Sequence, residues 1–138
     1  MRKVNCAGGI VLNPDGDVLV ITNQIGKYTF PKGTRKAKES PRETALREIT
    51  EESGLIRVEI IQFLGTLIRP GHTAENGTTP SVIKHIDMFH CITDTIELCP
   101  IEPDAISAQW VQPNKLDGLL TWQEEISFFN THRADLNL

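Results

Sequence analysis

Residues 33–55 read GTRKAKESPRETALREITEESGL, and this stretch decides the fold. It contains a capping box, in which Ser40 can accept from the first helical turn and a glutamate follows three residues later. Pro41 suits the first helical position, because its missing N–H has no partner there. Gly54 is a natural helix stop, since glycine adopts the left-handed backbone of a C-terminal cap. The spacing predicts a helix over about residues 41–53.

This helix carries three glutamates on adjacent turns, namely Glu48, Glu51 and Glu52. Like charges at this spacing cost a few tenths of a kcal/mol, and Arg47 offsets part of this cost through its i,i+4 pairing with Glu51. A solvated acidic face is one interpretation. The other is a cation site, since Mg²⁺ is held by one or two carboxylates together with substrate phosphates. The acids are expected to point away from the apolar face of the helix, which is formed by Ala45, Leu46 and Ile49.

The segment before the helix is basic. No acidic residue stands between Gln24 and Lys38, and this interval holds five cations: Lys27, Lys32, Arg35, Lys36 and Lys38. Such side chains bind phosphate oxygens. A cationic segment that leads into a carboxylate helix therefore suits a metal-bound polyphosphate, with the phosphates on the segment and the metal on the helix.

Composition limits the class of protein. The 138 residues suffice for one domain with its own core, so residues 1–138 are expected to form a single domain. Apolar residues make up 39% and charged residues 23%, which argues against a disordered or membrane protein. The net charge of −4 argues against a duplex-DNA binder. Three cysteines without C-x-x-C spacing favour free thiols, and we expect a cytoplasmic protein.

The remaining pattern predicts strands on either side of the central helix. Residues 23–38 read as irregular, and residues 69–80 and 97–104 read as loops, of which the first is long enough to indicate a function or mobility. A C-terminal helix is expected over residues 119–130. This order predicts an α+β fold with a mixed sheet between helices. The expected strands are 4–12, 18–22, 58–67, 81–93 and 109–112.

Residues 33–55 resemble the complete Nudix hydrolase signature, from its first glycine to its final apolar residue. At usual residue frequencies of about 5–8%, a chance match is far below about one in a million. The flanking residues 7–11 and 30–33 resemble the first strand of the family and its usual entry to the motif. The matching positions are Gly33, Glu39, Arg47, Glu48, Ile49, Glu51, Glu52, Gly54 and Leu55.

The resemblance implies an α/β/α sandwich and a reaction in which water attacks a phosphorus of a pyrophosphate, assisted by Mg²⁺ or Mn²⁺. It implies that Glu48 and Glu52 are metal ligands, that Glu51 is a third ligand, and that Glu48 also serves as general base. Arg47 resembles the residue that orients these glutamates, and Glu39 one with a supporting role near the metals.

Two further features of the metal site follow from the resemblance. The backbone carbonyl of Gly33 often completes the metal shell in the family. Many relatives also use an acid in the loop before the final strand, for which Glu102 and Asp104 are candidates, Asp104 having the better spacing. A solvated loop acid is the alternative interpretation of either residue.

The substrate is less well determined by the sequence. Residues 30–33 (FPKG) resemble the branch of the family that hydrolyses dinucleoside polyphosphates, and also the diphosphoinositol polyphosphate branch. The dinucleoside branch tends to carry a tyrosine after the motif, whereas Tyr28 precedes it here. Pro70, fifteen residues after Leu55, resembles the ADP-ribose branch, and oxidised deoxyguanosine triphosphate is a third option. The expected substrate contacts are Lys32, Arg35, Lys36, Lys38, Lys84 and, for the base, Tyr28, with Phe30, Trp110 and Trp122 as other aromatic candidates.

Dinucleoside polyphosphates such as diadenosine tetraphosphate are the first expectation. A non-catalytic nucleotide-sensing module is the alternative of another class, although such modules usually lose a motif glutamate and this chain keeps all three. RNA decapping ranks below both, because no RNA-binding extension is evident. We expect a small nucleotide as the only partner, with no stable nucleic-acid complex, no membrane association, and a monomer or homodimer.

Overall fold

The sheet is organised around the parallel pairing of β1 (Arg2–Leu12) and β6 (Val82–Thr93), which runs from Arg2 opposite Val82 to Leu12 opposite Ile92. This computed structural model describes residues 1–72, 81–101 and 105–138. Within these residues the strand order is β3-β2-β1-β6-β5, with β4 also paired to β1 and β7 also paired to β2. All pairings other than β1 with β6 are antiparallel. The remaining strands are β2 (Val18–Asn23), β3 (Tyr28–Thr29), β4 (Lys32–Thr34), β5 (Val58–Gly71) and β7 (Ala105–Val111).

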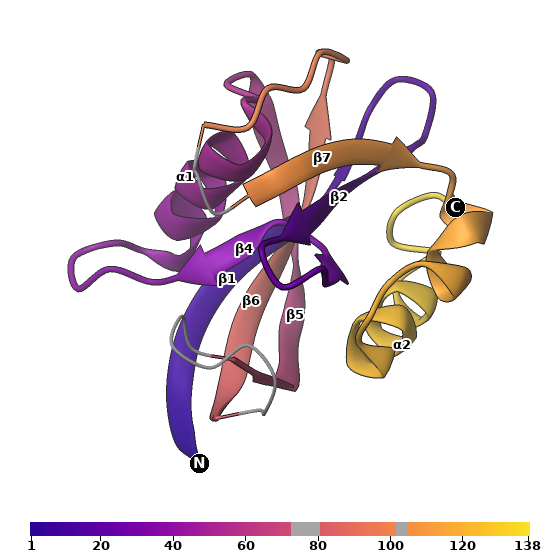
Figure 1. The fold of residues 1–138 in the computed structure, drawn as a ribbon. Coiled ribbons are helices and arrows are strands. Elements are labelled where there is room, and N and C mark those ends of the chain that lie inside the picture. The colour runs from indigo at the N-terminus through magenta and orange to yellow at the C-terminus, as the bar shows by residue number, and fades with distance from the viewer. Residues whose placement is uncertain (73–80, 102–104) are drawn as a thin grey trace.

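The two helices α1 (Pro41–Ser53) and α2 (Gln123–Thr131) lie on opposite sides of this sheet (Figure 1). Side chains that alternate along β1 separate the two halves of the core, because successive residues of a strand face opposite sides. Cys6 and Ile10 pack in the cluster that contains Phe129 of α2, whereas Ala7 and Val11 pack against α1. The predicted α/β/α sandwich with a mixed sheet is confirmed.

The central helix forms where the capping signals place it. Ser40 Oγ accepts from the Glu43 N–H, and the Glu43 carboxylate accepts from the Ser40 N–H at 2.9 Å. Gly54 ends the helix with φ 83°, and a Cβ there would lie 2.2 Å from the carbonyl oxygen of Cys99. The expectation for Leu46 is wrong: it is exposed, whereas Ala45 and Ile49 are fully buried.

Several expected boundaries shift, because pairing with distant strands extends or creates elements. Residues 23–38 contain the short strands β3 and β4 rather than irregular chain alone. Strand β5 runs on to Gly71 opposite Val82, so the expected loop over residues 69–80 begins later, and residues 73–80 lie outside the described residues. The pairing of β5 with β6 contains two register shifts, so β5 is a single strand with bulges.

The end of the chain also differs from expectation. Strand β7 begins at Ala105 rather than residue 109, since it pairs with β2 as far as Asn23. Residues 119–122 are not helical; a 3₁₀ helix occupies Pro113–Gly118 and α2 begins at Gln123. In the part of the chain that the structure describes, no helix is long and apolar enough to cross a membrane.

Candidate active site

The carboxylate of Glu48 lies directly against Gly33. A Cβ on Gly33 would stand 2.1 Å from Glu48 Cδ and 2.3 Å from Glu48 Oε1, well inside contact distance. Gly33 belongs to β4, which pairs with β1 at Ala7, and α1 packs over both strands. The motif glycine is therefore required by the close approach of the helix glutamate to the strand.

Gly33→Ala is expected to weaken divalent metal binding and any metal-dependent hydrolysis by roughly 10- to 100-fold, the usual cost of displacing a metal-site side chain. The free energy of unfolding should change by less than about 1 kcal/mol, because the added methyl meets the end of a flexible side chain. Isothermal titration with Mg²⁺ and urea unfolding measure the two effects. Gly118→Ala is the control, since a Cβ there has no neighbour within 4 Å. Unchanged metal affinity in Gly33→Ala would contradict this assignment.

Arg47 gathers the acidic residues of the motif. Its Nε donates to Glu39 Oε2 at 2.5 Å, and its Nη1 donates to Glu48 at 2.7 Å and to Glu51 at 3.1 Å. Its Nη2 donates to the carbonyl of Thr34 at 3.2 Å and to Glu39 Oε1 at 2.9 Å. One guanidinium thus contacts three carboxylates and the end of β4.

Glu39 is held by more than Arg47. Its Oε1 also accepts from the Lys36 N–H at 3.0 Å and from Thr44 Oγ1 at 2.9 Å. Hydrogen bonding from Arg47 lowers the pKa of Glu39 to about 2, so this carboxylate remains charged throughout the physiological range. Glu39 thus anchors the Arg47 guanidinium through two hydrogen bonds.

In contrast to Glu39, Glu52 and Glu48 lie in surroundings that raise their pKa values. Glu52 Oε1 accepts from the Lys32 N–H at 2.9 Å, and burial raises the pKa of Glu52 to about 7. Burial also raises the pKa of Glu48, against the lowering effect of Arg47. Both carboxylates are costly to ionise without a further cation nearby, a condition common at functional sites.

The donor chemistry fits a hard divalent cation. Carboxylate and backbone carbonyl oxygens are the ligands that Mg²⁺ prefers, and Glu48, Glu51, Glu52 and Gly33 supply them. Over residues 1–72, 81–101 and 105–138, no three Asp, Glu, His or Cys side chains are already grouped so as to hold an ion. Glu48 and Glu51 are both paired with the Arg47 guanidinium.

Metal affinity is expected to depend on pH through Glu52. The folded-state pKa of about 7 means that the carboxyl must lose a proton before it binds a cation. The dissociation constant for Mg²⁺ should therefore fall about tenfold per pH unit up to about pH 7 and level off above it. The fall is steeper where Glu48 must lose a proton as well. Titration calorimetry between pH 5.5 and 8 measures this change. Constant affinity across this range would contradict the assignment of Glu52.

Two of the predicted cationic residues lie beside the carboxylates. Lys84 of β6 stands opposite Val4 of β1, and Lys32 of β4 stands opposite Gly8 of the same strand. Their proximity, together with burial, lowers the pKa of Lys84 to about 8. A pair of converging cations in a partly buried position is suited to an anionic ligand. The side chain of Lys84 crosses Gly71, where a Cβ would lie 2.5 Å from its Cε.

The other three predicted cations lie in the turn before α1. Arg35, Lys36 and Lys38 are exposed, and Arg35 Nε donates to the carbonyl of Glu39 at 2.5 Å. Through its backbone N–H, Lys36 also contacts the Glu39 carboxylate, so this turn is tied to the Arg47 cluster. These residues form an exposed basic rim next to the motif glutamates.

The aromatic candidates for base binding separate into two groups. Phe30 is buried in the core, and Trp110 packs on the α1 side and donates from Nε1 to the carbonyl of Ile96. Tyr28 and Trp122 are half-buried neighbours, since the Tyr28 backbone exchanges two hydrogen bonds with Thr121. The second pair therefore remains available to a ligand.

Sequence reasoning missed a buried ion pair beside Trp122. Arg69 Nε donates to Glu125 Oε2 at 2.7 Å, and both side chains are 2% exposed. The Arg69 guanidinium lies 4.6 Å from the centre of the Trp122 ring, and the His72 ring lies 5.6 Å from it. In the sequence, Glu125 among apolar helix residues was the signal that could have indicated a buried charge. Arg69 gave no such signal, because it belonged to a stretch that read as a polar loop.

Glu102 and Asp104, the predicted loop acids, lie outside the described residues.

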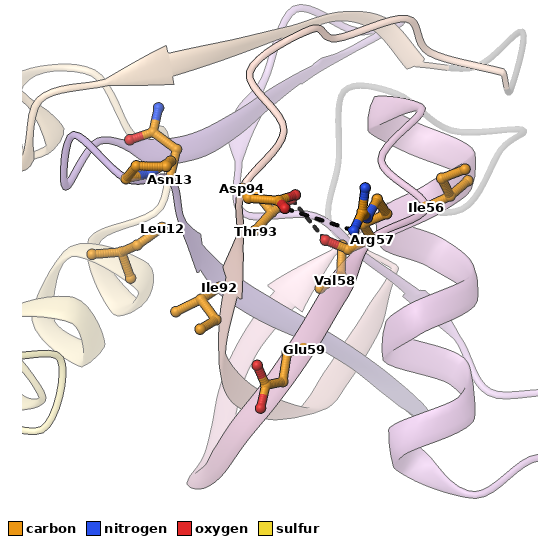
Figure 2. A pocket seen from close by; sticks show the side chains of 10 residues that line it. Leu12, Asn13, Ile56, Arg57, Val58, Glu59, Ile92, Thr93 and Asp94 are labelled. Atoms are coloured by element: carbon orange, nitrogen blue, oxygen red, sulfur yellow. Dashed lines mark hydrogen bonds and ion pairs between the residues drawn. The ribbon is translucent and has the colours of Figure 1, made fainter.

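A cavity of about 650 Å³ lies at the end of the sheet where Arg57 meets Asp94 (Figure 2), and another of about 680 Å³ lies beside Trp110. Among the described candidates, Trp110 lines the second cavity, whereas none of the catalytic or metal candidates lines either one, so neither cavity corresponds to the candidate metal site.

Comparison with known proteins supports the family interpretation. The sequence model of the NUDIX domain matches residues 2–129. A curated relative, putative 8-oxo-dGTP diphosphatase 3 of Mycobacterium tuberculosis, is 29% identical over 125 residues, which cover 82% of this chain and 54% of the relative. The chain thus spans about half the length of the curated relatives it matches.

Solved structures agree on the fold. The MutT protein from Methanosarcina mazei Go1 superposes with a TM-score of 0.78 at 18% identity, covering 97% of this chain and 95% of that one. A C. elegans Ap4A hydrolase binary complex also gives 0.78, at 16% identity and 97% and 98% coverage. The NUDIX domain of Shewanella oneidensis NrtR, complexed with ADP ribose, gives 0.75 at 13% identity and 99% and 90% coverage. The resemblance first drawn from residues 33–55 is confirmed, and this chain belongs to the NUDIX domain family.

Proposed function

We propose that this protein is a metal-dependent hydrolase that cleaves a pyrophosphate linkage in a nucleoside diphosphate derivative. The observation that carries the proposal is the arrangement of Glu48 and Glu52 on α1 beside Lys32 and Lys84 from two strands. Carboxylates for a cation and lysines for phosphate thus occupy one place. All three motif glutamates are present, which favours catalysis over a sensing module.

The residues take distinct roles in this proposal. Glu48 and Glu52 would hold the cation, Mg²⁺ or Mn²⁺, with Glu51 and the Gly33 carbonyl as further ligands. Such a cation supplies charge neutralisation at the phosphates and a more acidic water. Glu48 would also accept the proton of the attacking water, the role that the family resemblance implies for it. Arg47 and Glu39 would keep the glutamates in place, and Glu102 and Asp104 remain candidates for one further acid.

A dinucleoside polyphosphate such as diadenosine tetraphosphate is the first candidate substrate. Lys32 and Lys84 beside the carboxylates, with Arg35, Lys36 and Lys38 on the rim, offer cations along a long phosphate chain. The base would contact Tyr28 or Trp122, the half-buried aromatic neighbours. The FPKG entry at residues 30–33 points to the same class.

An oxidised deoxynucleoside triphosphate is the second candidate. The observation in its favour is the name of the Mycobacterium tuberculosis relative, a putative 8-oxo-dGTP diphosphatase. ADP-ribose ranks third. Pro70, which suggested it, lies within β5, and its carbonyl accepts from Arg69 at 2.7 Å.

The decisive experiment is a turnover assay on three substrates with Mg²⁺ and separately with Mn²⁺. Diadenosine tetraphosphate, 8-oxo-dGTP and ADP-ribose are incubated with the protein, and the products are separated chromatographically. ATP plus AMP from the first substrate, lost in Glu52→Gln, would support asymmetric dinucleoside polyphosphate hydrolysis. Turnover of another substrate would retain the hydrolase and replace the substrate, whereas no turnover with nucleotide binding intact would favour the sensing module.

The cellular setting and assembly stay predictions. We propose a cytoplasmic protein that acts on a small nucleotide as a monomer or homodimer. Cys6 and Cys91 are buried free thiols and Cys99 is an exposed one, which suits a reducing compartment. Sedimentation at micromolar concentration would distinguish the two assemblies.

A further inference from the structure

A fully buried carboxylate ties α2 to the segment that leads into the candidate metal site. Glu125 is 1% exposed and uses both oxygens. Its Oε2 accepts from Arg69 Nε at 2.7 Å, and its Oε1 accepts from the Phe30 N–H at 3.0 Å. One side chain of α2 therefore fixes both β5 and the backbone between β3 and β4.

The second of these bonds lies two residues before Lys32, whose backbone N–H contacts the candidate metal ligand Glu52. After Phe30, the Pro31 carbonyl accepts from the Gly9 N–H at 3.1 Å, and the Lys32 N–H donates to Glu52 Oε1 at 2.9 Å. Residues 30–32 thus form a short bridge with Glu125 at one end and Glu52 at the other. Between these two ends, the bridge has a further hydrogen bond to β1 through the Gly9 N–H.

Stability alone does not explain a buried ion pair at this place. Desolvating two charges offsets most of their attraction, so an apolar pair of similar volume is often as stable. The backbone bond from Phe30 to Glu125 serves another purpose, because an apolar side chain cannot accept from it. At 1% exposure, Glu125 also cannot reach a substrate directly, and its contact that leads toward Glu52 runs through residues 30–32.

We propose that Glu125 is a positioning residue for the metal site. By accepting from the Phe30 N–H, it holds residues 30–32 so that the Lys32 N–H orients the Glu52 carboxylate and Gly33 meets Glu48. The proposal rests on the proposed function in one respect, namely that Glu52 is a metal ligand. It assigns to α2, on the opposite side of the sheet from α1, a role in metal affinity.

The test compares two double variants that differ at residue 125, where one side chain can accept from the Phe30 N–H and the other cannot. Arg69→Met/Glu125→Gln and Arg69→Met/Glu125→Leu both lack the buried charges and have similar volumes, but only glutamine can accept from the Phe30 N–H. Binding of Mn²⁺ alone is measured by the electron paramagnetic resonance signal of the free ion. We expect the leucine variant to bind Mn²⁺ about tenfold more weakly than the glutamine variant.

A purely structural role would lower the melting temperature and leave the Mn²⁺ dissociation constant of the folded protein unchanged. Binding is therefore measured at a temperature where circular dichroism shows both variants folded. If the leucine variant does not fold, an ester in place of the Phe30 amide removes the same donor and keeps every side chain. Equal Mn²⁺ affinity in the two folded variants, or in the ester and the parent, overturns the proposal.

Glu52→Gln separates this failure from failure of the proposed function. If Glu52→Gln leaves Mn²⁺ binding unchanged, the metal site itself is misassigned and the positioning role falls with it. If Glu52→Gln weakens Mn²⁺ binding while the matched variants bind equally, only the role of Glu125 is wrong. If the matched variants differ and no nucleotide is hydrolysed, the positioning role stands and the hydrolase assignment fails.

Discussion

Glu52→Gln is expected to reduce kcat/KM at least about 1,000-fold while making the metal-free protein more stable at pH 8. The loss corresponds to about 4 kcal/mol of transition-state stabilisation, in keeping with removal of a metal ligand. The gain in stability follows from the pKa of Glu52, which is about 7 in the folded protein against an ordinary 4.5. Glutamine has no charge to bury, and its amide oxygen can still accept from the Lys32 N–H.

The sign of this stability effect is set by proton linkage. A carboxyl with a raised folded-state pKa favours folding when protonated, so wild-type stability falls as pH rises from about 4.5 through 7. Glu52→Gln should match the wild type near pH 4 and exceed it by up to about 3 kcal/mol at pH 8.

Urea unfolding without metal at both pH values measures this difference, and the turnover assay measures the loss of activity. Glu59→Gln, at an exposed position of β5, is the control and should change neither quantity. A destabilised Glu52→Gln at pH 8 would show that the charged carboxylate is favourably paired rather than strained by burial.

Arg69→Met is expected to destabilise the fold by about 3–5 kcal/mol, the largest effect on stability predicted for this chain. Arg69 is 3% exposed, and its removal leaves the Glu125 carboxylate buried without its cation. Arg69→Met/Glu125→Gln should recover much of this loss, because neither buried charge then remains. The double variant must therefore be more stable than the single one.

The measurement is the urea midpoint at pH 7.5, with the slope checked for constancy. Arg57→Met is a matched control, because Arg57 pairs with Asp94 at 3.9 Å but the two side chains are 74% and 67% exposed. That exposed pair should contribute less than about 1 kcal/mol. Additive losses in Arg69→Met and Glu125→Gln, with no recovery in the double variant, would mean that the two side chains do not act as a pair.

The helix over Pro41–Ser53 could be predicted to the residue because its signals are local. The capping serine, the proline at the first position and the terminal glycine all lie within fifteen residues, and each acts on the backbone next to it. Strands β3 and β4 could not be found in this way. They exist through pairing with β2 and β1, and nothing in two or three residues of sequence encodes that pairing.

The sequence by itself determined the residue types of the candidate site and their order along one helix. Only the tertiary structure decided what surrounds them. Lys84 comes near enough to Lys32 to lower its pKa because β1 pairs with both β6 and β4, and Arg69 pairs with Glu125 across 56 residues of chain. Burial, and with it the pKa of Glu52 and the pairing of Arg69, is a property of the assembled core, because desolvation depends on neighbours that the sequence places far away.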